Sequence, residues 1–161
     1  MEKEIATLAA GCFWGVEEIL RQIPGVLKTT VGYCGGESER PTYSTVKTGT
    51  TNHAEAIQIE FDPSKVTYEE ILLTFFRLHD PTTLNRQGND VGTQYRSAIF
   101  YNNEDQRLQA EKIKVIAQEN GLWKKPIVTE ITPLIKFWDA EADHQDYLQR
   151  NPHGYNCHYL R

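Results

Sequence analysis

The sequence contains no apolar run that approaches the length of a membrane-spanning helix, which needs about 20 consecutive apolar residues. Its start, Met1-Glu2-Lys3-Glu4, has neither the basic residues nor the apolar stretch of a secretory signal peptide. These two absences argue against a membrane protein and against a secreted one. We therefore expect a cytoplasmic protein that does not associate with a membrane.

An excess of positive charge is also missing. The 161 residues carry a formal net charge of -5, with acidic and basic side chains interspersed along the chain. Nucleic-acid binding normally relies on a basic surface, so we expect no nucleic-acid partner. This length fits one domain, and no repeat or linker interrupts it. We therefore expect residues 1–161 to form a single domain that is monomeric, because no pattern marks an apolar interface.

Cysteines are few, and cofactor motifs are absent. The chain has three cysteines, which is an odd number and too small for a disulfide framework, and it has no paired CxxC arrangement of a zinc site. It also has no GxGxxG or P-loop pattern that would bind a nicotinamide or a flavin. We expect no cofactor, no metal ion and three free thiols unless a reaction oxidises them: Cys12, Cys34 and Cys157.

The pattern of apolar residues predicts an α+β fold. The clearest strand is 53–61, where apolar and polar residues alternate with a period of two. Further strands are expected at 4–9, 26–33, 97–101 and 127–131, and helices at 13–23, 67–78, 104–120 and 140–149. The order up to Tyr101 is the β-α-β-β-α-β of a ferredoxin-like two-layer sandwich. An additional helix-strand unit and an irregular C-terminal tail then follow, and we expect the tail, 151–161, to be mobile.

Cys12 lies in the string Gly11-Cys12-Phe13-Trp14-Gly15, where a predicted strand meets a predicted helix. The free N–H groups at a helix start favour negative charge, so we expect a pKa for Cys12 below the ~8.5 of a free thiol. The resulting thiolate would be a nucleophile. The same pattern is also compatible with a small buried cysteine in an ordinary strand-helix corner.

Four other stretches contain more reactive and polar residues than packing requires. Glu55 has the same strand parity as Ile57 and Ile59, so we expect it to point inward, where desolvation favours its acid form. The other stretches contribute a phenol after a proline, an acid and a phenol in the long polar loop 82–95, and a thiol in the tail: Tyr43, Asp90, Tyr95 and Cys157. Taken singly, Glu55 is also compatible with a solvated strand position that faces outward, and Asp90 with a turn. Tyr43 and Tyr95 are also compatible with positions at the edge of the core.

Together and in this order, these stretches resemble the A-type peptide methionine sulfoxide reductases. The matching strings are GCFWG, VGYCGG, PTY, HAE, NDVGTQYRS, HQDYLQ and the glycine-tyrosine-cysteine tail, and they extend over nearly the whole chain. The tail holds only Cys157, which is similar to family members with a single resolving cysteine. Cys34 is expected to be structural.

The resemblance implies an enzyme in which Cys12 attacks the sulfoxide sulfur and becomes a sulfenic acid. It implies that Glu55 donates a proton to the sulfoxide oxygen, which otherwise leaves badly. Three further residues would hydrogen-bond this oxygen or a nearby water: Tyr43, Asp90 and Tyr95. The expected chemistry repairs oxidised proteins and also reduces free methionine sulfoxide.

The same resemblance assigns the substrate pocket and the electron supply. Phe13 and Trp14 would form the apolar pocket for the S-methyl group, and the family acts on the S epimer of the sulfoxide. Cys157 would form a disulfide with Cys12, and thioredoxin would reduce that disulfide.

Two other functions are compatible with some of these residues. A lone nucleophilic cysteine also serves acyl transferases and hydrolases, which need a histidine base, and His53 is the candidate close to these motifs. Aromatic residues beside Cys12 are also compatible with a non-catalytic protein that binds methionine-containing peptides. Such a binder would not consume thiols.

Overall fold

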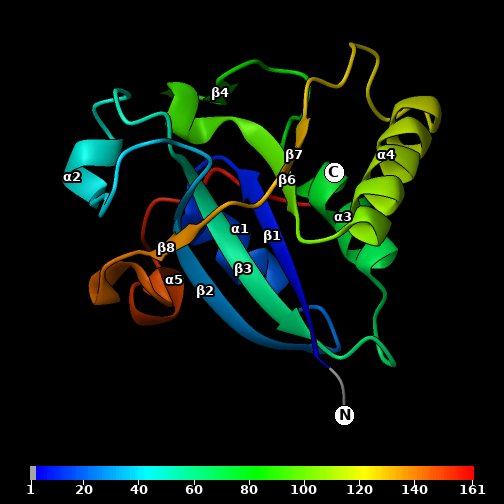
Figure 1. The fold of residues 1–161 in the computed structure, drawn as a ribbon, viewed down its shortest axis with the longest axis horizontal. Helices are drawn as coiled ribbons and strands as arrows, with labels where there is room; N and C mark the ends of the chain where they lie inside the picture. The colour runs from blue at the N-terminus through cyan, green and yellow to red at the C-terminus, as the bar shows by residue number, and fades with distance from the viewer. Residues whose placement is uncertain (1–2) are drawn as a thin grey trace.

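The computed structural model describes residues 3–161. Within them the main sheet is mixed and has the strand order β7-β6-β1-β3-β2-β8 (Figure 1). Its strands are β1 (Glu4–Ala10), β2 (Val26–Cys34), β3 (Ala54–Phe61), β6 (Ser97–Tyr101), β7 (Glu130–Pro133) and β8 (Phe137–Asp139). Met1 and Glu2, which contributed to the expectation that the chain is not secreted, lie outside the described residues.

The four inner strands form the predicted ferredoxin-like arrangement. β1 pairs antiparallel with both β3 and β6, and β2 pairs antiparallel with β3. The helices α1 (Phe13–Leu20) and α3 (Tyr68–Leu78) follow β1 and β3, which gives the order β-α-β-β-α-β. The predicted α+β class and this arrangement are confirmed.

The additional helix-strand unit is also present and extends the sheet at one edge. Helix α4 (Glu104–Glu119) leads into β7, which pairs parallel with β6 (Figure 1). The strand predicted at 127–131 begins later, at Glu130. The reason is that the backbone N–H of Val128 donates to the carbonyl oxygen of Pro81 instead of joining the sheet.

The helix predicted at 140–149 is wrong in its first half. A 3-10 turn covers Ala142–His144, and only Tyr147–Arg150 forms the short helix α5. The side-chain amide of Gln145 accepts from the N–H of Val31 at 2.9 Å and donates to the carbonyl oxygen of Val31 at 2.8 Å. These two bonds hold Gln145 in an extended conformation against β2, so the backbone cannot continue as a helix.

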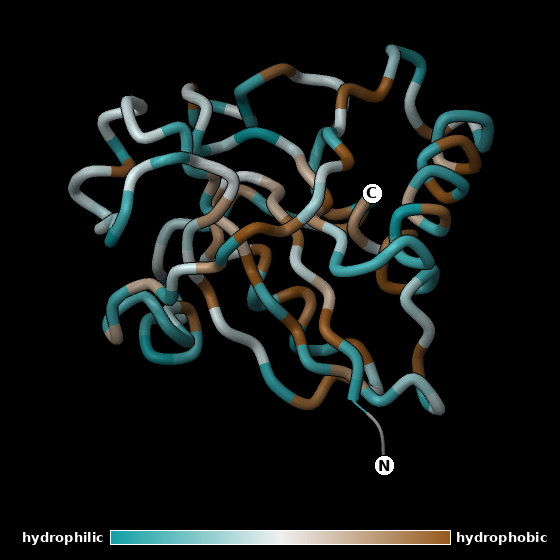
Figure 2. Tube along the Cα trace, viewed as in Figure 1, coloured by the Kyte–Doolittle hydropathy of each residue, from teal (hydrophilic) through white to brown (hydrophobic). Residues whose placement is uncertain are grey.

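Hydrophobic clusters lie on both faces of the sheet, because successive strand residues point to opposite sides. The larger cluster joins the apolar sides of α1, α3 and α4 to strand residues such as Leu8 and Ile57. Along α4, hydrophobic and hydrophilic residues alternate (Figure 2), as expected for a helix with one side on the core. The smaller cluster contains Cys34 and Phe100 and is covered by Phe137 and its neighbours.

The polar loop 82–95 contains short regular elements. β4 (Arg86–Gln87) pairs with β5 (Asp90–Val91), and a 3-10 turn covers Thr93–Tyr95. The short helix α2 (Tyr43–Val46) forms two residues after Pro41. These elements hold three of the predicted site residues on hydrogen-bonded backbone.

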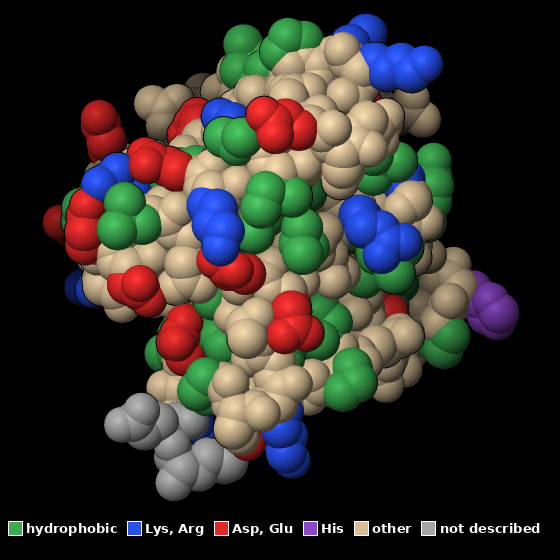
Figure 3. Space-filling model, turned by 90° about the vertical axis from the view of Figure 1, so that its right-hand side faces the viewer, with side chains coloured by type: hydrophobic (Ala, Val, Ile, Leu, Met, Phe, Trp, Pro, Cys, Tyr) green, Lys and Arg blue, Asp and Glu red, His purple; other side chains and the backbone are tan. Residues whose placement is uncertain are grey.

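The surface around α4 has mixed charge. Figure 3 shows acidic and basic side chains interspersed on this face of the molecule. The face shown therefore presents no field of one sign that would attract a polyanion. Among residues 3–161, no helix combines the length and the apolar character that crossing a membrane requires.

Candidate active site

Cys12 is the N-cap residue of α1 and comes directly after β1, as the sequence predicts. Gly11 precedes it with a φ of 93°, a left-handed conformation that glycine adopts at no steric cost. This turn buries the thiol, and only 7% of Cys12 is exposed. The candidate nucleophile therefore lies just below the surface at a strand-helix corner.

The predicted lowering of the Cys12 pKa is wrong. Burial raises the pKa of Cys12 well above its usual range, and the charges of Glu55 and Asp90 raise it further. A hydrogen bond from the backbone N–H of Trp14 acts in the opposite direction, as expected at a helix start, but the cost of removing the thiolate from water is larger. Cys12 is therefore a neutral thiol in the free protein.

Glu55 points inward from β3 and is 1% exposed, which confirms the orientation predicted from the alternation. Its Oε1 accepts a hydrogen bond from the backbone N–H of Phe13 at 3.2 Å. Burial raises the pKa of Glu55 to about 8, and the charge of Asp90 adds to this against the effect of the Phe13 bond. At neutral pH the side chain is mainly a carboxylic acid that holds a transferable proton.

Two phenols border the same space from different elements. Burial, followed by the charge of Glu55, raises the pKa of Tyr43 to about 12, and both effects raise the pKa of Tyr95 as well. Cys12 and Asp90 contribute to the raised pKa of both tyrosines, which shows that these groups share one electrostatic neighbourhood. Both phenols stay protonated at neutral pH and can donate hydrogen bonds.

The C-terminal tail brings Cys157 to this neighbourhood. Oδ2 of Asp90 accepts from the hydroxyl of Tyr155 at 3.1 Å and lies 3.8 Å from Sγ of Cys157. Burial raises the pKa of Cys157, and its charge contributes in turn to the raised pKa of Cys12. The structure therefore brings together the six polar residues that the sequence singles out: Cys12, Tyr43, Glu55, Asp90, Tyr95 and Cys157.

The tail is seated against α1 through His158, which is 5% exposed. Nε2 of His158 lies 2.6 Å from the carbonyl oxygen of Ala10, and its backbone N–H donates to Oδ1 of Asn156 at 2.9 Å. A Cβ atom on Gly15 would lie 2.7 Å from Nδ1 of His158, which is too close for two non-bonded atoms. Gly15 therefore has no side chain where the tail crosses the helix.

The end of the tail is held at a second point. The backbone N–H of Arg161 donates to the carbonyl oxygen of Arg77 at 2.9 Å, and Nε of Arg77 donates to the carbonyl oxygen of Arg161 at 2.9 Å. These contacts define one position of the segment 151–161. Its mobility stays a prediction.

An aromatic cluster surrounds the start of α1. The ring of Trp14 stacks on Tyr147 with centroids 3.9 Å apart, and its Nε1 donates to Nδ1 of His144 at 3.1 Å. The ring of Tyr43 lies 4.4 Å from that of His144. Phe13 is buried at 1% exposure, whereas Trp14 is partly exposed.

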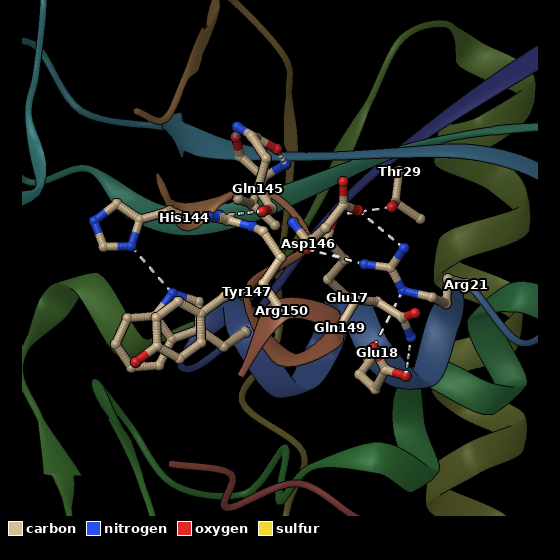
Figure 4. Close-up of polar contacts among 12 residues, drawn as sticks. Glu17, Glu18, Arg21, Thr29, His144, Gln145, Asp146, Tyr147, Gln149 and Arg150 are labelled. Carbon is tan, nitrogen blue, oxygen red and sulfur yellow. Dashed lines mark hydrogen bonds and ion pairs between the residues drawn. The ribbon is translucent and has the colours of Figure 1, made fainter. Parts of the chain in front are cut away.

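A network of polar contacts joins α1 to the segment that carries this cluster (Figure 4). The buried carboxylate of Glu17 accepts from the hydroxyl of Thr29 at 2.8 Å and from the backbone N–H of Asp146 at 2.9 Å. Arg21 forms ion pairs with Glu17 at 3.3 Å and with Asp146 at 2.9 Å. Because Asp146 lies directly between Gln145 and Tyr147, this network fixes the place of the Tyr147 ring against Trp14.

His53 and Cys34 lie outside this arrangement. Nδ1 of His53 accepts from the N–H of Gly36 at 3.1 Å, and Nε2 lies 2.7 Å from the carbonyl oxygen of Ser38. Both ring nitrogens are thereby engaged, so His53 does not serve as a base for Cys12. Cys34 belongs to the cluster on the other face of the sheet, where burial raises its pKa to about 12.

Three residues around the site did not emerge from the sequence reasoning as site residues: His144, Tyr147 and His158. The pattern of apolar residues predicts only an ordinary helix over the first two, and the spacing of His144, His153 and His158 fits no common zinc site. Among residues 3–161, no group of three or more His, Cys, Asp or Glu side chains is placed to hold a metal ion. The string HQDYLQ was the available signal for the first two.

Comparison with known proteins gives consistent results. A family model described as Peptide methionine sulfoxide reductase matches residues 4–161. The peptide methionine sulfoxide reductase MsrA of Leifsonia xyli subsp. xyli is 52% identical over 158 residues, which cover 98% of this chain and 91% of that protein. The MsrA of Pseudomonas fluorescens is 53% identical over 158 residues, which cover 98% of this chain and 74% of that protein.

Solved structures agree in fold. The crystal structure of Mxr1 from Saccharomyces cerevisiae in reduced form is 42% identical with a TM-score of 0.94, covering 99% of this chain and 93% of that one. Mxr1 in complex with Trx2 is 30% identical with a TM-score of 0.68, covering 99% of this chain and 91% of that one. With the geometry around Cys12 and Glu55, these matches show that the chain belongs to the A-type peptide methionine sulfoxide reductases, a family of oxidoreductases.

Proposed function

We propose that Cys12, Glu55 and Cys157 carry out the thiol-dependent reduction of methionine S-sulfoxide to methionine in this chain. The observation that supports this most directly is a buried carboxyl group with a pKa of about 8, bonded to the first residue of the helix that Cys12 caps. Sulfoxide reduction needs such a pair, because the oxygen leaves the sulfur only when it receives a proton.

In the first step, the sulfur of Cys12 attacks the sulfoxide sulfur while Glu55 protonates the sulfoxide oxygen. The thiol proton of Cys12 passes to the Glu55 carboxylate, so the acid is restored. Methionine leaves, and a sulfenic acid remains on Cys12. The sulfoxide sulfur is reduced by two electrons, and the Cys12 sulfur is oxidised by two.

The surrounding residues orient the substrate. The raised pKa values of Tyr43 and Tyr95 keep both phenols protonated, so they can donate to the sulfoxide oxygen or to a nearby water, which Asp90 also orients. Phe13 and Trp14 form the apolar side for the S-methyl group. Donors on one side and rings on the other select the S epimer.

In the second step, Cys157 attacks the sulfenic sulfur, and a Cys12–Cys157 disulfide and one water form. The contact between Asp90 and Cys157 supports this assignment, because Asp90 also belongs to the neighbourhood of Cys12. Thioredoxin then reduces the disulfide by thiol exchange. The relative Mxr1, solved in complex with Trx2, supports a thioredoxin as the donor.

The proposal includes the setting of the reaction. The chain acts as a monomeric cytoplasmic protein, with residues 1–161 as one catalytic domain and 151–161 as a mobile tail that carries Cys157. Its substrates are oxidised proteins or peptides and free methionine S-sulfoxide. The reaction uses no cofactor or metal ion, because protein thiols supply the electrons.

A single turnover without reductant tests these roles. The enzyme is mixed with excess methionine S-sulfoxide, and the expected result is one methionine per chain, a loss of two hydrogens in intact mass, and a peptide map with Cys12 joined to Cys157. The R epimer, run in parallel, should give no methionine.

Two variants provide the contrast. Cys12→Ser should release no methionine, whereas Cys34→Ser, which alters a buried thiol on the other face of the sheet, should behave as the unaltered protein does. Full turnover by Cys12→Ser, or a disulfide that includes Cys34, would refute the assignment.

A further inference from the structure

Among the described residues, His158 is the one histidine whose ring lies within hydrogen-bond distance of a thiol, and that thiol is Cys157. Nδ1 of His158 lies 3.6 Å from Sγ of Cys157, within the range of a hydrogen bond to sulfur. The first step described above does not use this imidazole. His158 is 5% exposed and is the one buried residue of the tail 151–161, whose other residues are exposed or half-buried.

The contact on the far side of the ring defines which nitrogen can accept a proton. Nε2 lies 2.6 Å from the carbonyl oxygen of Ala10, and a carbonyl oxygen can only accept, so Nε2 carries the hydrogen. In the neutral ring Nδ1 then has a free lone pair, and this lone pair faces Cys157. Burial lowers the pKa of His158, which keeps the ring neutral at physiological pH.

Asp90 is the other group that could take the thiol proton, and the geometry favours His158. Oδ2 of Asp90 lies 3.8 Å from Sγ of Cys157 and already accepts from the hydroxyl of Tyr155 at 3.1 Å. Nδ1 of His158 lies closer to the same sulfur, at 3.6 Å. The carboxylate is therefore suited to orient the thiol, and the imidazole is suited to deprotonate it.

We propose that His158 is the general base that takes the thiol proton of Cys157 when the Cys12–Cys157 disulfide forms. The inference rests on the resolving role proposed above for Cys157. An S–S bond forms, the S–O bond of the Cys12 sulfenic acid breaks, and the hydroxyl leaves as water with a proton from Glu55. His158 releases its proton to solvent and Glu55 regains one, so the sum is one disulfide and one water.

The same ring also positions the tail, and the two roles can be separated by choice of variant. In His158→Gln the side-chain amide can still donate to the carbonyl oxygen of Ala10, but it offers no basic nitrogen to Cys157. His158→Ala removes both the anchor and the base. His153→Gln is the matched control, because His153 lies in the same tail and is exposed.

The experiment follows both steps in rapid-quench single turnovers without reductant, with methionine release measured directly and the sulfenic acid trapped by a dimedone-type reagent. For His158→Gln we expect unchanged methionine release and a disulfide that forms at least about tenfold more slowly, with trapped sulfenic acid in excess. His153→Gln should match the unaltered protein in both steps. Added imidazole should restore part of the rate in His158→Ala.

The pH profile of disulfide formation distinguishes the two roles, because loss of the anchoring contact alone would not change its shape. In the unaltered protein the rate should fall on the acid side as His158 becomes protonated, and this limb should vanish in His158→Gln. The charged or titratable groups that act on His158 are Cys157, Asp90, Arg161 and His79, and all remain in the variant.

The outcomes separate the two proposals. If His158→Gln forms the disulfide at a rate within twofold of the unaltered protein, or keeps the acid limb, the base assignment is overturned, even if His158→Ala is slow. If the unaltered protein releases methionine but joins Cys12 to another thiol, the resolving role of Cys157 fails first and the inference fails with it.

Discussion

The backbone N–H of Phe13 donates to Oε1 of Glu55 at 3.2 Å, and this bond joins the first residue of α1 to the buried carboxyl group of β3. Because Cys12 is the N-cap of the same helix, the bond fixes the distance between the thiol and the acid. It also engages one carboxyl oxygen with the backbone, which leaves the other oxygen for the proton that we propose Glu55 transfers.

Replacement of Glu55 by glutamine should lower the rate of the first chemical step without disrupting the fold. The amide oxygen can still accept from Phe13, but the side chain has no proton to transfer, so we expect methionine release to slow by about 10²- to 10⁴-fold. In the unaltered protein the rate should also fall as the pH rises through about 8, because the acid form is lost. Single-turnover rates between pH 6 and 10 measure both effects, and an unchanged rate in Glu55→Gln would contradict the role.

The raised pKa of Glu55 also makes stability depend on pH. The folded protein holds this proton up to about pH 8, whereas the unfolded chain loses it near the reference value of about 4.3. The stability that Glu55 contributes is therefore complete below about pH 4 and decreases as the pH rises toward 8. Urea unfolding should show that the unaltered protein loses stability relative to Glu55→Gln between pH 5 and pH 8, because glutamine does not titrate. A gain in the stability of the unaltered protein relative to Glu55→Gln over this range would refute this.

Gly15→Ala should separate the two chemical steps. The added methyl group would meet Nδ1 of His158, so the tail must shift, but alanine favours helix by about 1 kcal/mol and α1 is not weakened. We expect methionine release within about twofold of normal and a disulfide that forms at least about tenfold more slowly. Thermal unfolding checks that the fold is kept. If both steps run at the rates of the unaltered protein, the tail does not need this space.

Removal of the Glu17 carboxylate should destabilise the protein. Thr29, Arg21 and the N–H of Asp146 would all lose a partner in a largely buried place, so we expect Glu17→Ala to cost about 3 kcal/mol of unfolding free energy. The neighbouring Glu18→Ala serves as the control, because its more exposed contacts contribute less than about 1 kcal/mol. Urea unfolding measures the loss of unfolding free energy in each variant. Equal losses would show that the polar network around Glu17 does not stabilise the fold.

Residues whose environment is local were predicted well from the sequence. The alternation in β3 predicted that Glu55 points inward with Ile57 and Ile59, because strand parity is set by the backbone alone. The strand-helix corner at Cys12 was likewise predicted from apolar spacing. The grouping of Tyr43, Asp90 and Tyr95 around Cys12 came from the family resemblance, since no local pattern relates residues so far apart.

Properties that depend on distant residues were missed. The pKa of Cys12 was predicted from its own helix, but burial and the charges of Glu55 and Asp90 determine its direction. The helix expected at 140–149 fails because the Gln145 side chain bonds Val31, more than a hundred residues earlier. Spacing within a segment contains no information about such a bond.

The first three residues of α1 each lie against a different part of the structure. The N–H of Phe13 donates to Glu55, and the ring of Trp14 stacks on Tyr147. Gly15 has no side chain and so leaves space for His158. Successive helix residues are rotated by about 100°, so three directions around the axis are occupied in one turn. Inserting or deleting one residue here would turn every later position toward the wrong neighbour. One helical turn therefore positions the proposed acid, the proposed substrate pocket and the tail that carries Cys157, and the geometry of the helix sets the angles between them.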